Sequence, residues 1–441
     1  MHLVNSKSQG IATRFRTVPH PVAANIHKEL RKKVEAVVDS VIGGLISPLT
    51  DEEKSAQKTS LTKGEKVGVV FTGTLAEVNE HFYNNLWTDG LPIVPPTDEA
   101  VNEMLSGTDL PPDHLLAIVE PLKGKATVEK VAISAVMAGA RPEYMPVIIA
   151  AVEAITDPAF GLATVQATTH PVTPLLIING PIRNQLDINS GTGCFGPGWQ
   201  ANATIGRALR LIMINLGGGF PKVTDMATQG QPGKYTMCIG ENEEALPPSW
   251  EPLHVERGFN RESSTVTAFP AQGLIKAGYG GLTPMAEAMA TAVQYTYCYG
   301  PQEVLVVFSP DDVKYVVKGI SVPPTIIGGH TKEEAQRYLY ENSAVQYGRL
   351  MRGWGMHDVW REQVGPGKPR ECITRSDPND TVPIVQSPGK VVIIVAGGPG
   401  LHSVFIPAGL DSPIMISKEI KLPRNWDEIL ERAKPHMRRR L

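Results

Sequence analysis

A glycine-rich loop that carries a cysteine and leads into an apolar helix is the clearest chemical feature of this sequence. Residues 189–199 read N-S-G-T-G-C-F-G-P-G-W, and an apolar helical pattern follows over 203–216. The glycines of the loop are Gly191, Gly193, Gly196 and Gly198. Glycine adopts a positive φ readily, so these positions allow successive N–H groups to point to one side and form a nest that binds an anion. The free N–H groups at the start of the helix would face the same anion.

The expected ligand of this loop is a carboxylate or phosphate group of a small molecule. No Gly-Lys-Ser/Thr follows, so the loop is not a Walker A motif, and the glycine spacing does not fit a dinucleotide fingerprint. The sequence therefore gives no signal for a nucleotide cofactor. A loop shaped only by close packing is the alternative. The expected substrate-binding residues are Asn189, Ser190, Gly191, Gly193, Asn202, Thr204, Arg207 and Lys234, the last two as sources of positive charge.

Cys194 and two histidines are candidates for nucleophilic or proton-transfer chemistry. Cys194 lies inside the loop, where a helix N-terminus would lower the pKa of its thiol. A small buried apolar residue is the alternative interpretation of this cysteine. His170 precedes an expected buried strand at 174–179, and His402 follows an expected strand beside glycines. Both positions suit acid–base work.

A polar stretch over 225–258 supplies carboxylates next to the loop helix. It is rich in Lys, Glu, Asn, His and Arg but has no helical or strand periodicity. Glu241, Glu244 and Glu256 are its candidate general bases, since each becomes one if burial raises its pKa, and Glu241 and Glu256 are the candidate catalytic residues. A solvated surface loop is the alternative.

Metal binding has no local signal, because the chain contains no His-x-x-x-His or His-Glu-x-x-His spacing. A divalent metal held by ligands from distant loops remains an alternative. Its candidate ligands are His170, His254, His330 and His402.

Composition limits the partners that we expect. The 441 residues include 42 basic and 45 acidic side chains, and no charge block gives a nucleic-acid footprint. Four widely spaced cysteines give no disulfide framework and favour a reducing cytoplasm. The N-terminus lacks the apolar segment of a signal peptide, and no apolar run approaches the about 20 residues of a membrane span. We therefore expect a cytoplasmic protein with a small-molecule substrate and neither nucleic acid nor membrane as a partner.

The pattern of apolar runs predicts an α/β fold, with mixed or parallel sheets flanked by helices. Residues 1–66 form an expected helical arm and linker that packs on a partner subunit or on the main body, which favours a homo-oligomer. Residues 67–264 and 265–441 form two expected α/β domains, with strands alternating with helices. An echo between I-I-N-G-P at 177–181 and V-A-G-G-P at 395–399 marks either two related lobes or chance.

Several distinctive strings carry a family resemblance over residues 70–430. They include W-T-D-G-L-P-I-V-P-P-T at 87–97, Q-A-T-T-H-P at 166–171, the loop at 189–198 and Q-G-Q-P-G-K-Y at 229–235. In these strings the chain resembles an uncharacterised bacterial family that is grouped with UGSC-type (seleno)proteins. The resemblance implies an intracellular protein but names no reaction. The chain lacks the Cys-Gly-Ser-Cys element of the UGSC proteins, so no catalytic residue is carried over.

Together these features predict a small-molecule enzyme, a lyase or hydrolase that acts on an anionic organic substrate held at the loop. A metal-dependent enzyme is one alternative. A non-catalytic ligand-binding protein or assembly subunit is the other.

Overall fold

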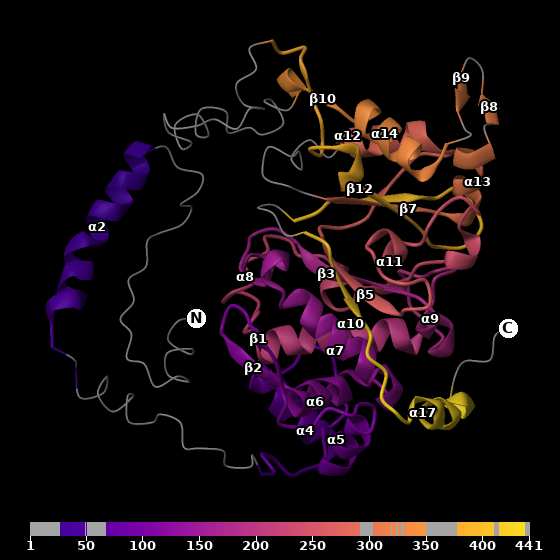
Figure 1. Ribbon diagram of the computed structural model, residues 1–441. Helices are drawn as coiled ribbons and strands as arrows, with labels where there is room; N and C mark the ends of the chain where they lie inside the picture. The colour runs from indigo at the N-terminus through magenta and orange to yellow at the C-terminus, as the bar shows by residue number, and fades with distance from the viewer. Residues whose placement is uncertain are drawn as a thin grey trace. The chain divides into compact units, whose positions relative to one another are not determined.

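The computed structural model in Figure 1 describes residues 27–48, 50, 68–291, 303–318, 320–322, 325–327, 330–349, 377–409 and 414–436. Contacts divide the chain into two compact units, Met1–Thr72 with Gln346–Thr381 and Gly73–Val345 with Val382–Leu441. The first unit contains helix α2, His27–Ile46, within the expected arm. The rest of that arm lies largely outside the described residues, so its packing stays a prediction.

The second unit is built on two four-stranded mixed sheets. The first sheet has the order β14 (Ile416–Glu419), β5 (Thr265–Ala271), β3 (Thr173–Asn179), β4 (Cys238–Gly240). The second has the order β12 (Val391–Val395), β7 (Val304–Phe308), β13 (Val404–Ile406), β6 (Ile275–Lys276). β3 pairs in parallel with β4, and β12 in parallel with β7, whereas the other pairs are antiparallel. Mixed sheets flanked by helices confirm the α/β class, and the pseudo-repeat stays a prediction.

The helices of the second unit are α4 (Leu75–Asn84), α5 (Asp98–Leu105), α6 (Val128–Ala138), α7 (Met145–Ile155), α8 (Leu162–Gln166), α9 (Ile182–Gln185), α10 (Gln200–Asn215), α11 (Leu253–Glu256), α12 (Leu282–Thr291), α13 (Pro310–Lys318), α14 (Lys332–Asn342) and α17 (Trp426–Ala433). The remaining strands are β1 (Leu115–Val119), β2 (Gly124–Thr127), β8 (Ile320–Val322), β9 (Thr325–Ile327), β10 (Val345–Gln346) and β11 (Thr381–Val382). No helix among the described residues combines the length and the apolar character needed to cross a membrane.

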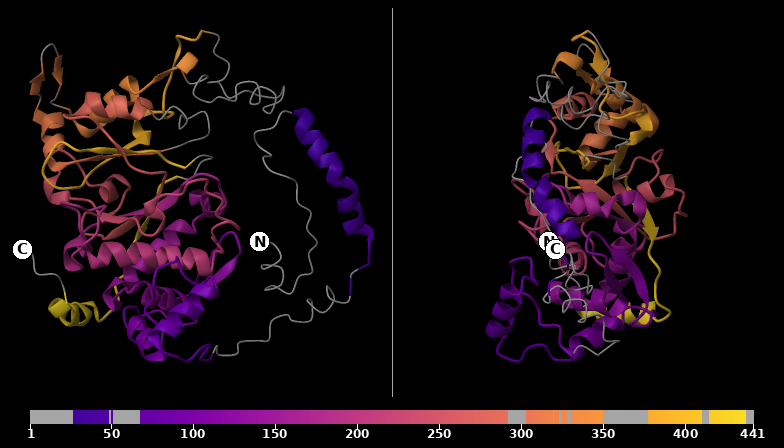
Figure 2. Two further views of the ribbon diagram at one scale, coloured as in Figure 1. Left: turned by 180° about the vertical axis from the view of Figure 1, so that it is seen from behind. Right: turned by 90° about the vertical axis from the view of Figure 1, so that its left-hand side faces the viewer.

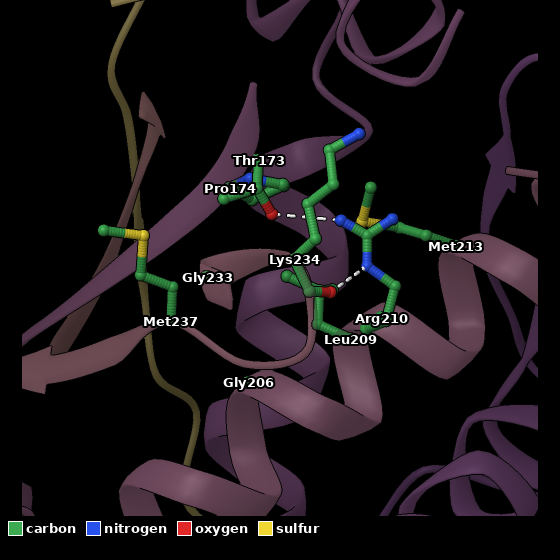
Figure 3. A pocket seen from close by; sticks show the side chains of 9 residues that line it. All are labelled: Thr173, Pro174, Gly206, Leu209, Arg210, Met213, Gly233, Lys234 and Met237. Atoms are coloured by element: carbon green, nitrogen blue, oxygen red, sulfur yellow. Dashed lines mark hydrogen bonds between the residues drawn. The ribbon is translucent and has the colours of Figure 1, made fainter. Parts of the chain in front are cut away.

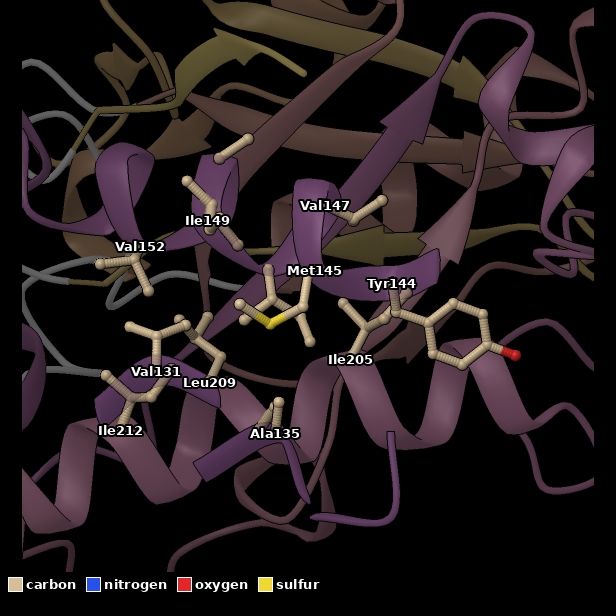
Figure 4. Packing of buried hydrophobic residues seen from close by; sticks show 14 of the residues in the cluster. Val131, Ala135, Tyr144, Met145, Val147, Ile149, Val152, Ile205, Leu209 and Ile212 are labelled. Carbon is tan, nitrogen blue, oxygen red and sulfur yellow. The ribbon is translucent and has the colours of Figure 1, made fainter. Parts of the chain in front are cut away.

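The two sheets pack face to face, with helices outside each of them (Figures 1 and 2). Leu175 and Ile177 of β3 join an apolar core with residues of β7 and β12. Leu176 and Ile178, which point to the opposite face of β3, join a second core with α6, α7 and α10 (Figure 4). α12 and α14 cover the far side of the second sheet. β3 is therefore buried on both faces.

Local signals account for several of these elements. Thr97, Thr127 and Thr331 accept hydrogen bonds from the first turns of α5, α6 and α14, as their N-cap positions indicate. The apolar run G-V-V-F at 68–71 also predicts a strand, and this prediction is wrong. Residues 68–73 pair with no strand that the structure describes, and Val69 and Val70 are exposed. An apolar run becomes a strand only where a partner strand is available.

We expect substitutions in the core between the two sheets to cause the largest losses in the free energy of unfolding. Phe269 of β5 is fully buried in the inter-sheet core. Phe269→Ala should lower the free energy of unfolding by about 3–5 kcal/mol, because it leaves a cavity where a ring was. Chemical denaturation measures this loss. Tyr83→Ala, at a side chain that is 60% exposed, should change it by less than about 0.5 kcal/mol. Equal effects in the two variants would contradict the placement of Phe269.

Candidate functional site

The glycine-rich loop lies at the C-terminal ends of parallel strands from both sheets. The amide of Gly240, at the end of β4, donates to Asn189 O at 3.1 Å. The amide of Gly397, just after β12, donates to Ser190 O at 2.8 Å. The side chain of Asn202 holds the loop from α10, since it accepts from Asn189 N at 2.8 Å and donates to Asn189 O at 3.0 Å.

Only part of the loop can act as an anion nest. The amides of Gly191, Cys194 and Gly196 donate to acceptors within the loop. Gly193 has a positive φ of 71° and Gly198 one of 119°, whereas Gly191 and Gly196 do not. Two consecutive amides, Thr192 and Gly193, donate no hydrogen bond to any residue that the structure describes. Helix α10 begins after Trp199 without a side-chain cap, so its first amides are also available.

Cys194 is a protonated, buried thiol. Its side chain joins the inter-sheet core with Ile177 and Val392. Burial raises the pKa of the Cys194 thiol to about 11. The pKa therefore moves in the direction opposite to the one that a helix N-terminus would produce, because loss of water around the thiolate outweighs nearby amide dipoles.

A polar cluster with a buried centre, the Glu241 cluster, adjoins the loop at the same edge. It consists of Asn179, Arg183, Glu241, Glu243, Glu244 and His254. Glu241 directly follows β4 and its carboxylate accepts from Asn179 Nδ2 at 2.5 Å and from Leu253 N at 2.8 Å. Since Asn179 ends β3, two parallel strands deliver these side chains to one place, where α/β proteins commonly bind ligands.

Glu241 has the pKa of an acid–base group at neutral pH. Its side chain is fully buried, and this burial raises the pKa of Glu241 to about 7. The positive charge of Lys332 and the hydrogen bonds from Leu253 and Asn179 lower this pKa, but the effect of desolvation is larger. Both the protonated and the ionised form of Glu241 are thus accessible near pH 7.

Unpartnered polar atoms gather around Glu241. Among the described residues, nine buried side-chain atoms lack a hydrogen-bond partner, and five of them belong to this region. They are Asn179 Oδ1, Glu241 Oε1, Trp250 Nε1, His254 Nδ1 and Thr265 Oγ1. Thr265 is the strand partner of Asn179. Native proteins seldom leave such atoms unsatisfied without a functional reason, so this concentration marks the cluster as the candidate site.

The other charges of the cluster hold its geometry. Arg183 donates to both carboxylate oxygens of Glu244, at 3.2 and 3.1 Å, and to Glu241 O at 2.7 Å. Partial burial would raise the pKa of Glu244, but the hydrogen bonds and charge of Arg183 outweigh this effect and lower the pKa to about 2. Glu243 accepts from Asn179 Nδ2 and Gly180 N, and lies 3.8 Å from His254 Nδ1.

Glu256 is bound in a separate ion pair, in which Lys332 is buried and Glu256 is partly exposed. Its carboxylate lies 2.9 Å from Lys332 Nζ, which also donates to Glu251 O and lies over the ring of Trp250. Burial raises the pKa of Glu256, although Lys332 opposes the shift. Because Lys332 also acts on Glu241, the pair borders the Glu241 cluster.

Thr204, Arg207, Lys234 and His402 have partners outside the loop. Thr204 donates to Gln200 O within α10. Arg207 donates two hydrogen bonds to Asp89, and Lys234 donates two to Asp225, so their charges are neutralised elsewhere. His170 precedes the opposite end of β3. The ring of His402 lies 5.1 Å from the ring of Tyr279, centre to centre, and is tilted against it by 56°.

Sequence reasoning missed Asn179, Arg183 and Lys332. Asn179 carried a usable signal, a polar residue that ends a buried apolar strand just before Gly-Pro. Arg183 and Lys332 carried none, because the acidic residues and carbonyls that they bind around Glu241 lie 58 or more residues away along the chain. In the part of the chain that the structure describes, no three His, Cys, Asp or Glu side chains are grouped so as to hold a metal ion.

The buried thiol predicts low reactivity. A pKa of about 11 in place of the ordinary 9.0 makes the thiolate of Cys194 about 100-fold rarer at neutral pH. Iodoacetamide should therefore label Cys194 of the native protein at least about 100-fold more slowly than the same cysteine in urea, as followed by peptide mass spectrometry. Labelling at equal rates would contradict the burial of this thiol.

The raised pKa of Glu241 predicts a pH-dependent stability difference. The folded state holds this proton more tightly than the unfolded state, so the stabilisation is present below the ordinary pKa of 4.5 and is lost as pH rises through about 7. Between pH 5 and pH 8 the wild type should lose up to about 3 kcal/mol relative to Glu241→Gln, measured by denaturation at each pH.

Glu244→Gln is the matched control for this measurement. With a pKa lowered to about 2 from the ordinary 4.5, Glu244 is ionised in the folded state and mostly ionised in the unfolded state over the same pH range. The difference between wild type and Glu244→Gln should therefore stay flat from pH 5 to pH 8. A flat profile for Glu241→Gln as well would contradict the raised pKa.

No family model, curated protein or solved structure gives a significant match to the chain. The resemblance to the UGSC-type group stays a prediction from the sequence strings alone. The chemistry of the chain must therefore be inferred from the loop and the Glu241 cluster.

Proposed function

We propose that the protein is a small-molecule enzyme, a lyase or hydrolase, that acts on an organic substrate carrying a carboxylate. The observation that carries this proposal is Glu241, a fully buried carboxyl group with a pKa near 7 and an unpartnered oxygen. Perturbed carboxyl groups of this kind are typical of acid–base catalysts.

Glu241 would act as the general base of the reaction. A base is most effective when its pKa lies near the working pH, since the ionised form is then populated and still accepts a proton readily. In a lyase the ionised carboxylate removes a proton from carbon next to the substrate carboxylate. In a hydrolase it removes a proton from the attacking water.

The glycine-rich loop would hold the substrate anion. The amides of Thr192 and Gly193 and the uncapped start of α10 are its available donors. Backbone contacts join this loop to Gly240, the residue before Glu241. The proposal does not use Arg207 and Lys234 at this site, because each already pairs with its own carboxylate. Cytoplasmic location and assembly into a homo-oligomer accompany the proposal as predictions.

Turnover of small organic carboxylates tests the assignment. The purified wild type is incubated with a panel of such acids, and products are detected by mass spectrometry. Glu241→Gln should reduce the rate by about 10²–10⁴-fold, because the amide cannot accept the proton. For the wild type, kcat/KM should rise tenfold per pH unit below about pH 7 and level off above it.

Glu129→Gln, at an exposed position in the first turn of α6, should keep the wild-type rate. Wild-type activity in Glu241→Gln would remove this residue from the mechanism. Stoichiometric transition metal in the purified protein would favour the metal-dependent alternative. A bound carboxylate without any turnover would favour the binding-protein alternative.

A further inference from the structure

Arg210 is a buried cation without an acidic partner. It lies on α10, its residue is only 8% exposed, and its two hydrogen bonds go to uncharged acceptors. Nε donates to Lys234 O at 2.5 Å, and Nη2 donates to Thr173 Oγ1 at 3.0 Å (Figure 3). Throughout the described ranges, no carboxylate forms an ion pair with this guanidinium.

The carboxylates that act on Arg210 through space are already paired. Asp89 accepts two hydrogen bonds from Arg207, and Asp225 accepts two from Lys234 Nζ. Three cations thus share two anions, and one positive charge is left over. A buried charge is unfavourable unless it is paired, so this arrangement lacks one negative charge.

A pocket places Arg210 within reach of solvent. Its enclosed part is small, about 10 Å³, and it continues into open solvent at the N-terminal ends of β3 and β4. Figure 3 shows the guanidinium between Thr173 and Met213. The apolar part of the lining consists of Pro174, Leu209, Met213 and Met237.

We propose that this pocket binds the carboxylate of a small organic acid, with Arg210 as its principal partner. A guanidinium has five N–H groups, and only two of those of Arg210 are used within the protein. The three that remain can meet a planar carboxylate with two parallel hydrogen bonds. The enclosed part of the pocket has room for little more than one carboxylate oxygen, so the rest of the acid would lie in the open mouth.

This site is distinct from the Glu241 cluster. Thr173 begins β3 and Asn179 ends it, so the two sites lie about 20 Å apart along the strand. The inference does not depend on the proposed function, because it follows from the unpaired charge and the pocket alone.

Thermal unfolding of the full-length protein in acetate tests the proposal. Acetate replaces chloride from 0 to 100 mM at constant ionic strength, so general screening stays unchanged. The wild type should show a saturable rise in Tm of about 2–4 °C. Arg210→Met, which keeps the length of the side chain without its charge, should show none. Arg424→Met, at a side chain that is 95% exposed, should respond as the wild type does.

Met213→Glu provides a second variant, because it places a carboxylate in the same lining. It should lose the response to acetate, and its Tm in chloride should equal or exceed that of the wild type in chloride. A wild type without a saturable rise, or a rise that persists in Arg210→Met, would overturn the proposal. A rise with phosphate in place of acetate, and none with acetate, would overturn the assignment of a carboxylate.

Discussion

Burial of β3 on both faces determines where charged groups can lie in the second unit. All seven residues of the strand are buried, with one face against the second sheet and the other against α7 and α10. Such a strand cannot carry a charge along its length, so ionisable groups gather at its two ends. Arg210 meets Thr173 at the start of the strand, and Glu241 meets Asn179 at its end. The same packing that stabilises the fold thus creates two electrostatically different sites.

The glycine-rich loop shows why packing and binding are not exclusive explanations for glycine. A Cβ on Gly398 would lie 2.2 Å from Thr192 Oγ1, so close approach to the loop requires glycine there. A Cβ on Gly240 would lie 3.1 Å from Ser190 Cβ. A Cβ on Gly193 would have no neighbour within 4 Å, but the residue has a positive φ, which favours glycine. Glycines around the loop therefore allow close packing, whereas Gly193 inside it turns the backbone and exposes its amide.

Sequence reasoning succeeded where the determining interaction is local. Thr127 caps α6 by accepting a hydrogen bond from the backbone amide three residues later. The apolar side chains at 174–179 are by themselves enough to predict a buried strand. Sequence reasoning failed for the charged side chains, because the partners that neutralise them are distant in the sequence. Arg207 pairs with Asp89 across 118 residues, and no local pattern shows this. Glu241 was a sequence candidate, but its raised pKa depends on burial that only the packed sheets produce.

Burial has different chemical consequences for different ionisable groups. Glu241 can respond to desolvation by keeping its proton, and its pKa then moves into the neutral range where proton transfer is useful. Lys332 is stabilised instead by an ion pair with Glu256. Arg210 neither becomes neutral nor forms an ion pair, since a guanidinium does not lose its proton in proteins and both nearby carboxylates are paired with other cations. Desolvation therefore makes Glu241 a candidate for chemistry, and makes Arg210 a candidate for binding a negatively charged ligand.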